Sequence, residues 1–252
     1  MQFTKEEIAQ IIDIAKKAGK ETLKYYHEDV KVDSKDDDSP VTAADLAAHN
    51  VIVPWLEHFT PDIPVISEEG GIPDYETRKS WSRFWIVDPL DGTKEFIKQL
   101  DEFTINIALV DDGKPVLGVV YVPALGVTYW GAEQLGAYKI DPDGNEKRIF
   151  SNKSDRDDQL IVAVSRSHGS EKQEAYLADL NVKERISAGS SLKFCLVAEG
   201  RADIYPRLGP TMEWDVAAGD AVFRYSAENG EHDSPLTYNK QNLKNGDFVV
   251  GF

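Results

Sequence analysis

Residues 85–96, WIVDPLDGTKEF, place two acidic side chains directly after an apolar run. The first three residues of this stretch predict the end of a buried strand. Asp88 and Asp91 follow, with a proline between them and a glycine after them, and both residue types favour a tight turn. Taken alone, the pattern is also an ordinary turn sequence. A buried carboxylate is costly without a positive partner, however, so the stretch raises the question of which cation lies beside it.

The composition points to a metal ion as that cation. The chain has 252 residues, of which 44 are acidic and 28 basic, giving a formal net charge of -16. This balance argues against binding nucleic acid or an anionic membrane, both of which need basic patches. An acidic protein acts on an anionic substrate when bound cations reverse the local charge. Metal ions are therefore the first candidates for the partner of the two aspartates.

The sequence also predicts a location in the cytoplasm. The N-terminal stretch MQFTKEEIAQ has no apolar segment typical of a secretion signal. No run approaches the roughly 18 apolar residues of an integral membrane segment. Cys195 is the single cysteine, which excludes an internal disulfide and fits a reducing compartment. We expect a monomer or a weak homodimer, and peripheral association with the cytoplasmic face of the inner membrane stays open.

The first half of the chain predicts two helices followed by a sheet. The capping-box pattern at 4–7 and the apolar residues after it predict a long amphipathic helix that ends near Tyr26. A polar loop is expected at 31–40, and a second helix from Thr42, which Pro54 should bend or interrupt. The expected strands cover residues 63–66, 84–87, 103–110, 115–122, 127–130 and 135–140.

A different rhythm follows the loop DPDGNEK at 141–147, which is the best internal boundary. Strands and helices alternate beyond it, as expected for an α/β arrangement. We therefore predict an α+β half at 1–140 and an α/β half at 148–252. The strands expected in the second half cover 160–165, 185–189, 202–206 and 248–252, and the helices cover 170–180, 190–200 and 214–226.

Four short stretches carry acidic residues where strands or helices should begin or end: 42–45, 67–69, 88–93 and 214–215. Each also has an ordinary explanation, such as a capping box at 42–45 or a helix start at 214–215. Together they offer the oxygen ligands that Mg²⁺ prefers, and the Leu90 carbonyl could add another. The five histidines and Cys195 lie far apart in the sequence, which argues against a zinc site.

Longer motifs identify the chain with a known family. SEE at 67–69, WIVDPLDGTKEF at 85–96 and WDVAAGDAV at 214–222 resemble the lithium-sensitive, Mg²⁺-dependent phosphatases of the inositol monophosphatase superfamily. Further stretches resemble its bacterial CysQ branch, the 3'(2'),5'-bisphosphate nucleotidases. They are SPVTAAD at 39–45, DGTKEF at 91–96, GSSLKFCLVAEGRADIYPR at 189–207 and LGPT at 208–211. The resemblance covers essentially the whole chain.

The resemblance implies a fold and a metal site. The fold would be a layered αβαβα sandwich of the inositol monophosphatase and fructose-1,6-bisphosphatase type. Two or three Mg²⁺ ions would bind, with Li⁺ as an inhibitor. The first half would carry most of the metal ligands and the second half Asp215. One ion would be held by Glu68, Asp88 and the Leu90 carbonyl, and a second by Asp88, Asp91 and Asp215. Asp45, hydrogen-bonded to the Thr93 hydroxyl, would help to orient and deprotonate the attacking water.

The resemblance also implies a substrate, a nucleotide bisphosphate whose 3'-phosphate is hydrolysed to give AMP and phosphate. Gly92 and Thr93 should open a helix whose N–H groups cradle phosphate oxygens. Arg207 could reach the 5'-phosphate or stack on adenine, or be an ordinary surface residue. Glu213 would add negative charge nearby. A second helix start lies at Gly189, Ser190 and Lys193, where another anionic or sugar group of the substrate would bind. The same residues could equally form a plain N-cap.

Two alternatives stay open. The first is the same chemistry on inositol 1-phosphate, fructose 1,6-bisphosphate or the sulfated nucleotide. The second is a non-catalytic, metal-binding interaction protein. The presence of Thr93 and Asp45, which metal binding alone would not need, argues against the second.

Overall fold

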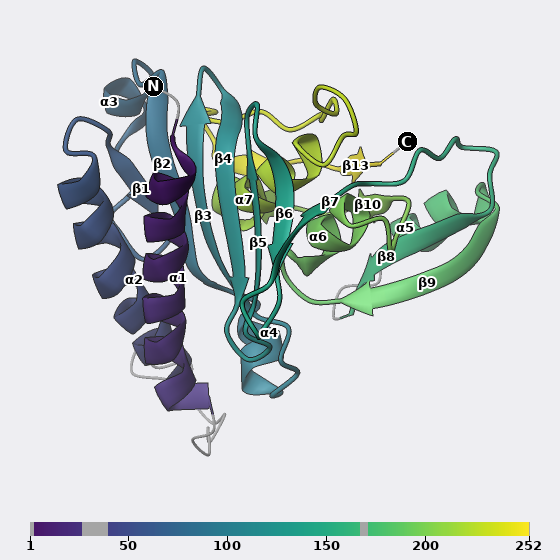
Figure 1. Cartoon of the computed structure of the whole chain (residues 1–252). Helices are drawn as coiled ribbons and strands as arrows, with labels where there is room; N and C mark the ends of the chain where they lie inside the picture. Colours follow the sequence, from purple (N-terminus) through teal and green to yellow (C-terminus); the bar gives the residue numbers. More distant parts are fainter. Residues whose placement is uncertain (1–2, 27–39, 167–170, 252) are drawn as a thin grey trace.

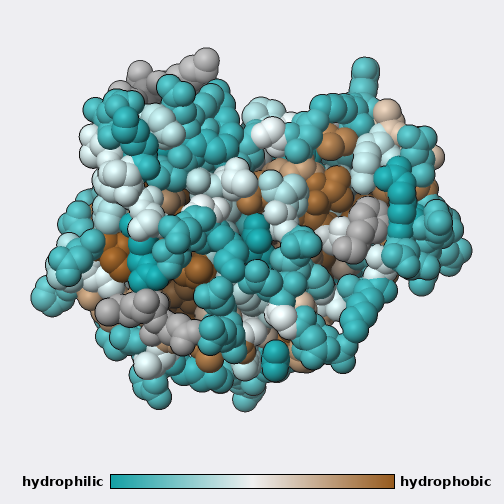
Figure 2. Space-filling view, turned by 90° about the horizontal axis from the view of Figure 1, so that it is seen from above, coloured by the Kyte–Doolittle hydropathy of each residue, from teal (hydrophilic) through white to brown (hydrophobic). Residues whose placement is uncertain are grey.

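Five layers of helices and sheets make up the protein (Figure 1). The computed structural model describes residues 3–26, 40–166 and 171–251. The polar loop expected at 31–40 lies outside these residues, apart from Pro40. None of the helices within the described ranges combines the length and the apolar character of a membrane span. The face seen from above in Figure 2 is mostly hydrophilic, in keeping with the acidic composition.

The second layer is a seven-stranded sheet whose strands lie side by side in chain order. β1 and β2 are parallel, and every later pair is antiparallel. Apolar residues on both faces of β2, β3 and β4 are buried, so the sheet has a core on each side. The strands are β1 (Val65–Ser67), β2 (Arg83–Asp91), β3 (Thr104–Asp111), β4 (Lys114–Val122), β5 (Val127–Ala132), β6 (Gly136–Ile140) and β7 (Glu146–Ile149).

Two long helices, α1 (Lys5–Tyr26) and α2 (Pro40–Phe59), cover one face of this sheet as the first layer. The capping box is confirmed, because the Thr4 backbone N–H donates to Glu7 Oε2 and the Glu7 N–H to Thr4 Oγ1. α1 reaches Tyr26, the last residue described in this part of the chain, and its predicted end there stays a prediction. Pro54 does not interrupt α2, which continues to Phe59.

The opposite face of the sheet packs against α7 (Glu213–Arg224), with α6 (Leu192–Ala198) beside it. The approach of α7 requires glycine in the sheet. A Cβ atom on Gly131 would lie 2.8 Å from the Ala221 carbonyl oxygen, and one on Gly118 would overlap the Ala218 carbonyl. These two glycines let the α7 backbone rest directly on β4 and β5.

The last two layers are a smaller group of strands and α5 (Glu171–Ala178). An apolar cluster that includes Leu160, Leu177 and Ile204 joins them. The order helix, sheet, helix, sheet, helix confirms the predicted αβαβα sandwich. β8 (Leu160–Ser165) is parallel to β9 (Val182–Ala188), and β10 (Tyr205–Arg207) is antiparallel to β13 (Phe248–Val250).

The predicted loop at 141–147 is shorter in the structure, because Glu146 and Lys147 already belong to β7. β6 and β7 pair with each other, so the large sheet continues past the loop. The division into 1–140 and 148–252 therefore stays a prediction. Short elements complete the chain near the site. They are α3 (Tyr75–Arg78), α4 (Thr93–Ile97), β11 (Thr211–Met212) and β12 (Lys244–Asn245).

Candidate active site

The acidic stretch at 88–91 is a bulged strand end rather than a turn after the strand. β2 runs on to Asp91, whereas the sequence predicted its end at Val87. Asp88 lies opposite Asn106 and Asp91 opposite Thr104, so β2 has one residue more than β3 in this interval. The bulge brings both aspartates to one face of the sheet, since their partners are two residues apart. An unbulged strand would point them to opposite faces.

The parallel pairing of β1 with β2 brings in Glu68. Ser67 lies opposite Val87, and the Glu68 N–H donates to the Val87 carbonyl at 3.2 Å. β1 therefore ends opposite Val87 while β2 continues to Asp91, and Glu68 emerges beside Asp88. The parallel pairing of these neighbouring strands thus brings the two carboxylates together.

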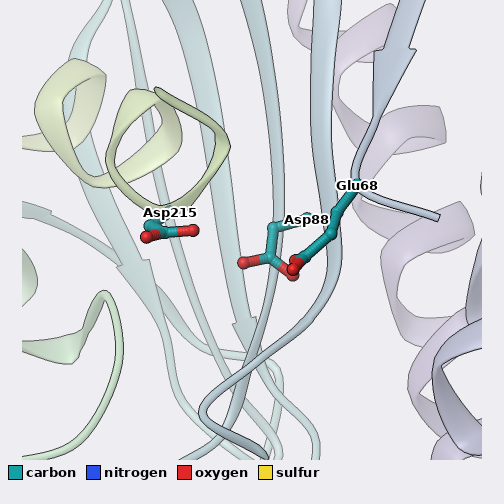
Figure 3. A group of neighbouring side chains, drawn as sticks. All are labelled: Glu68, Asp88 and Asp215. Atoms are coloured by element: carbon teal, nitrogen blue, oxygen red, sulfur yellow. The ribbon is translucent and has the colours of Figure 1, made fainter. Parts of the chain in front are cut away.

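Asp215 reaches the same place from the other side of the sheet. It lies in the first turn of α7, where its Oδ2 accepts the Met212 N–H at 2.8 Å. One carboxylate oxygen from each of Glu68, Asp88 and Asp215 lies within 4.8 Å of the other two. Figure 3 shows the three side chains. Asp91 is outside this group of three, although its charge acts on two of its members.

The site holds more negative charge than its own groups balance. Burial is the largest cause that raises the pKa of Asp91 to about 7 and of Asp215 to about 6. Burial also raises the pKa of Asp88 well above its usual range, and the charges of neighbouring carboxylates raise it further. The pKa of Glu68 is raised for the same leading reason. A cation placed among these oxygens would offset the repulsion, so the donor set fits a hard divalent ion such as Mg²⁺.

Asp45 lies next to this group on α2 and is 7% exposed. Burial first, and then the charges of Glu69 and Glu68, raise its pKa to about 8. Its Oδ1 atom is buried without a hydrogen-bond partner among the described residues. A side-chain interaction with Glu69 raises the pKa further, and the expected hydrogen bond between Asp45 and Thr93 stays a prediction.

Thr93 begins α4, as predicted, and its side chain is exposed. Gly92 caps this helix with a φ of 97°, a conformation that favours glycine. Both residues line a cavity of about 250 Å³ that also reaches Asp91 and Asp215. The acidic site therefore opens into a pocket.

The cavity also has a cationic wall. Lys193 and Arg207 both line it, although they come from α6 and β10. The Arg207 guanidinium donates to Ser165 Oγ at 3.3 Å and to the Pro210 carbonyl at 3.2 Å, while its buried Nε has no partner among the described residues. The same cavity is thus lined by carboxylates and by these two cations, whose charges oppose the rise that burial causes in the pKa values of Asp91 and Asp215.

Comparison with known proteins identifies the family. Residues 4–225 match the model of the inositol monophosphatase family. The chain belongs to this family. It is 51% identical over 217 residues to the 3'(2'),5'-bisphosphate nucleotidase CysQ of Salmonella typhimurium, covering 85% of this chain and 86% of that relative. The CysQ protein of Escherichia coli strain K12 is 50% identical over 225 residues, 88% of each chain.

Solved structures support the same assignment. CysQ of Bacteroides thetaiotaomicron, described as a bacterial member of the inositol monophosphatase family, superimposes with a TM-score of 0.83 and 44% identity. The match covers 95% of this chain and 94% of that one. An inositol monophosphatase of Thermotoga maritima has a TM-score of 0.75 at 23% identity, which shows the fold alone. Inositol monophosphatases depend on metal ions, and the cluster of Glu68, Asp88 and Asp215 is where this family member could bind one.

The loop before α6 forms more hydrogen bonds within the protein than the sequence indicated. The Gly189 N–H donates to Glu102 Oε2, and Ser190 Oγ to the Glu102 carbonyl. Lys193 is 3% exposed, and its ammonium donates to the Ala188 and Ser190 carbonyls. Burial lowers the Lys193 pKa to about 8. In this family member these groups therefore shape the pocket wall, and substrate contact by them stays a prediction.

Two residues near the site were missed by sequence reasoning. Asn106 donates from Nδ2 to Asp91 Oδ2 at 3.4 Å, and Glu102 bonds the Gly189–Ser190 loop. Neither belongs to a motif with a known chemical role. The signal for Asn106 was present, however, because it is a polar residue within the apolar run FTINIALV.

Proposed function

We propose that this member of the inositol monophosphatase family hydrolyses the 3'-phosphate of adenosine 3',5'-bisphosphate to give AMP and phosphate. The observation that carries the proposal is that one cavity is lined both by the carboxylates Asp91 and Asp215 and by the cations Lys193 and Arg207. Such a site can hold a reacting phosphate at the acidic side and a second anionic group at the cationic side. The CysQ relatives are 3'(2'),5'-bisphosphate nucleotidases, and at about half identity over most of both chains this chain is a phosphatase of the same kind.

The expected Mg²⁺ ligands are the carboxylates of the acidic site together with a backbone oxygen. When bound, the metal supplies positive charge that favours deprotonation of an attacking water and offsets the charge of the phosphate. The raised pKa values of these carboxylates support this assignment, because an ion would relieve the same repulsion that a proton relieves. The proposed ligands are Glu68, Asp88, the Leu90 carbonyl, Asp91 and Asp215.

Asp45 and Thr93 would handle the attacking water. A buried carboxylate whose pKa is raised to about 8 is a stronger base than an exposed one, and a base works best when its pKa is near the working pH. The unpaired Oδ1 of Asp45 has capacity to accept a proton. The Thr93 hydroxyl, exposed to the cavity, would orient the water, and the N–H groups at Gly92 and Thr93 would hold phosphate oxygens.

Arg207 would bind the second phosphate. Its guanidinium is already held by Ser165 and the Pro210 carbonyl, so little freedom is lost when a ligand binds. Its unpaired Nε leaves one donor unused among the described contacts. Lys193, whose ammonium is held by the Ser190 carbonyl, would add positive charge to the cavity.

Phosphate release by the purified chain with Mg²⁺ tests the function. The substrates are adenosine 3',5'-bisphosphate, inositol 1-phosphate and fructose 1,6-bisphosphate, each with and without Li⁺ and with EDTA as the metal-free control. We expect rapid, Li⁺-inhibited release from the nucleotide. Preference for a sugar phosphate would overturn the substrate while keeping the metal site. No release from any of them by a folded, Mg²⁺-binding chain would favour a non-catalytic role. The oligomeric state and the cytoplasmic location stay predictions from the sequence.

Thr93→Ala tests the role of the hydroxyl separately from metal binding. If Thr93 orients the water, kcat should fall by about a hundredfold. Mg²⁺ affinity, measured by calorimetry, should change much less. Equal losses in both quantities would assign Thr93 to the structure of the metal site instead.

A further inference from the structure

A buried arginine links the connection between β1 and β2 to the C-terminal part of the chain. Arg78 ends α3 and is 3% exposed. Its guanidinium donates to Asn239 Oδ1 at 2.9 Å and to the carbonyls of Lys240 and Gln241 at 2.7 and 2.8 Å. Asn239 Nδ2 donates back to the Arg78 carbonyl at 2.7 Å and to the Trp81 carbonyl at 3.2 Å. The two segments are therefore joined in both directions.

Glu213 connects the same segment to α7. It is the first residue of that helix, and its side chain is fully buried. Its carboxylate accepts the backbone N–H groups of Asn239 and Lys240 at 2.7 and 3.1 Å and forms an ion pair of 2.7 Å with the Lys240 ammonium. The extra charge that the sequence placed near the substrate is thus balanced within the protein, which corrects the expectation for Glu213.

The position of this network in the chain gives it a consequence for the metal site. Arg78 lies between β1, which delivers Glu68, and β2, which delivers Asp88. Glu213 lies two residues before Asp215 on α7. The network therefore joins the two parts of the structure whose carboxylates must meet within 4.8 Å.

We propose that Arg78, Asn239 and Glu213 are positioning residues that fix Asp215 relative to Glu68 and Asp88, and so set the affinity of the site for its metal ion. The proposal rests on the metal site of the proposed function. The network touches none of the reacting groups; it acts by holding α7 and the β1–β2 connection in one arrangement. Residues that orient metal ligands in this indirect way typically change metal affinity by roughly 10–100-fold when lost.

The test is Mg²⁺ affinity of the EDTA-treated full chain, measured by isothermal titration calorimetry for Arg78→Met and Asn239→Gly. The glycine variant keeps the backbone φ of 66° and the N–H that Glu213 accepts, and removes only the side-chain bonds to Arg78 and Trp81. It carries the test if Arg78→Met does not fold.

Arg224→Met is the matched control. Arg224 is also a buried arginine that donates to carbonyls of the C-terminal segment, those of Ser234 and Leu236, but it lies at the opposite end of α7. Its loss should lower the melting temperature of the metal-free chain without moving Asp215.

We expect Mg²⁺ affinity to fall about tenfold or more in the two network variants and to stay within about twofold in the control. Unchanged affinity in Asn239→Gly, or an equal loss in Arg224→Met, would overturn the positioning role. Because the readout needs no substrate, an incorrect choice of nucleotide would not affect it. A wild-type chain that binds no Mg²⁺ would instead overturn the metal site of the proposed function, and this proposal with it.

Discussion

Two of the regions in which the protein buries carboxylates treat these groups in opposite ways. Along α7, Asp220 accepts hydrogen bonds from Arg224 Nε at 3.0 Å and from the Tyr238 hydroxyl at 2.9 Å, and Glu213 is paired with Lys240. At the end of β2, by contrast, Asp88 is surrounded by other carboxylates, whose charges all raise its pKa. Both regions lie against the same sheet, so burial alone does not distinguish them.

The difference in charge balance between the two regions indicates where a cation should bind. A carboxylate balanced by its own chain is part of the structure, whereas a buried group of carboxylates left unbalanced needs a cation from outside. The cation at the β2 end is also available to a substrate, because the site opens into the cavity lined by Arg207. The comparison therefore assigns stability to one region and chemistry to the other, and matched substitutions can test that assignment.

Asp88→Asn should give the largest effect on activity. Asp88 is 1% exposed and central to the three-carboxylate group, so its loss should lower kcat/KM by about a thousandfold or more. The metal-free variant should be at least as stable as the wild type at pH 8, because one of several repelling charges is gone. Phosphate release and urea unfolding in EDTA measure the two quantities. Near-full turnover would contradict the metal assignment.

Asp220→Asn is the same substitution in the balanced region and should have the opposite consequence. Arg224 would remain buried without its anionic partner, so the free energy of unfolding should fall by about 3–5 kcal/mol. Mg²⁺ affinity of the folded fraction should be close to that of the wild type. Urea unfolding with and without Mg²⁺ measures both. If Asp220→Asn and Asp88→Asn changed stability in the same direction, the division between the two regions would be wrong.

The motifs allowed much of this arrangement to be predicted from sequence, but not the balance of charge. The run WIVDPLDGTKEF indicated a strand ending in acidic residues, and the helix at WDVAAGDAV placed Asp215 in a first turn. The bulge opposite Asn106 was not predictable, because a bulge is defined by the register with another strand.

The partners of charged residues were equally hidden. Glu213 lies two residues before Asp215, so the sequence predicted that it adds negative charge to the site. Its carboxylate instead binds partners about 26 residues further along the chain. Lys193 lines the cavity, and the sequence did not indicate that its ammonium also donates to carbonyls of its own loop. Sequence patterns locate charges near a site, whereas long-range packing decides which of them remain unpaired.

The pH dependence of stability should also reveal the carboxylates of the acidic site. The pKa values of Asp45, Asp91 and Asp215 are raised to about 8, 7 and 6 in the folded chain. A raised folded-state pKa favours the folded state at low pH, and this contribution is lost as the pH rises through 6 to 8. The melting temperature of the metal-free chain should therefore fall over this range.

Mg²⁺ should reverse this trend, because it binds the deprotonated carboxylates and replaces the lost protons. Melting temperatures at pH 5.5, 7 and 8.5, with EDTA or with Mg²⁺, provide the measurement. The stabilisation by Mg²⁺ should grow with pH. The same series on Asp88→Asn should show a smaller dependence on both pH and metal. A metal-free melting temperature that does not change across this range would show that the carboxylates are balanced by some other means.

The smallest effect is expected from a carboxylate that is balanced but partly exposed. Glu102 forms a two-bond ion pair with Arg166, whose side chain is 41% exposed. Solvent screens such a pair, so Arg166→Met should change the free energy of unfolding by less than about 1 kcal/mol, and the change should shrink further in high salt. Urea unfolding at two ionic strengths measures it. A loss as large as that of Asp220→Asn would mean that exposure does not weaken this ion pair. It would indicate that Arg166 also holds Glu102 in place for its hydrogen bonds with Gly189 and Ser190.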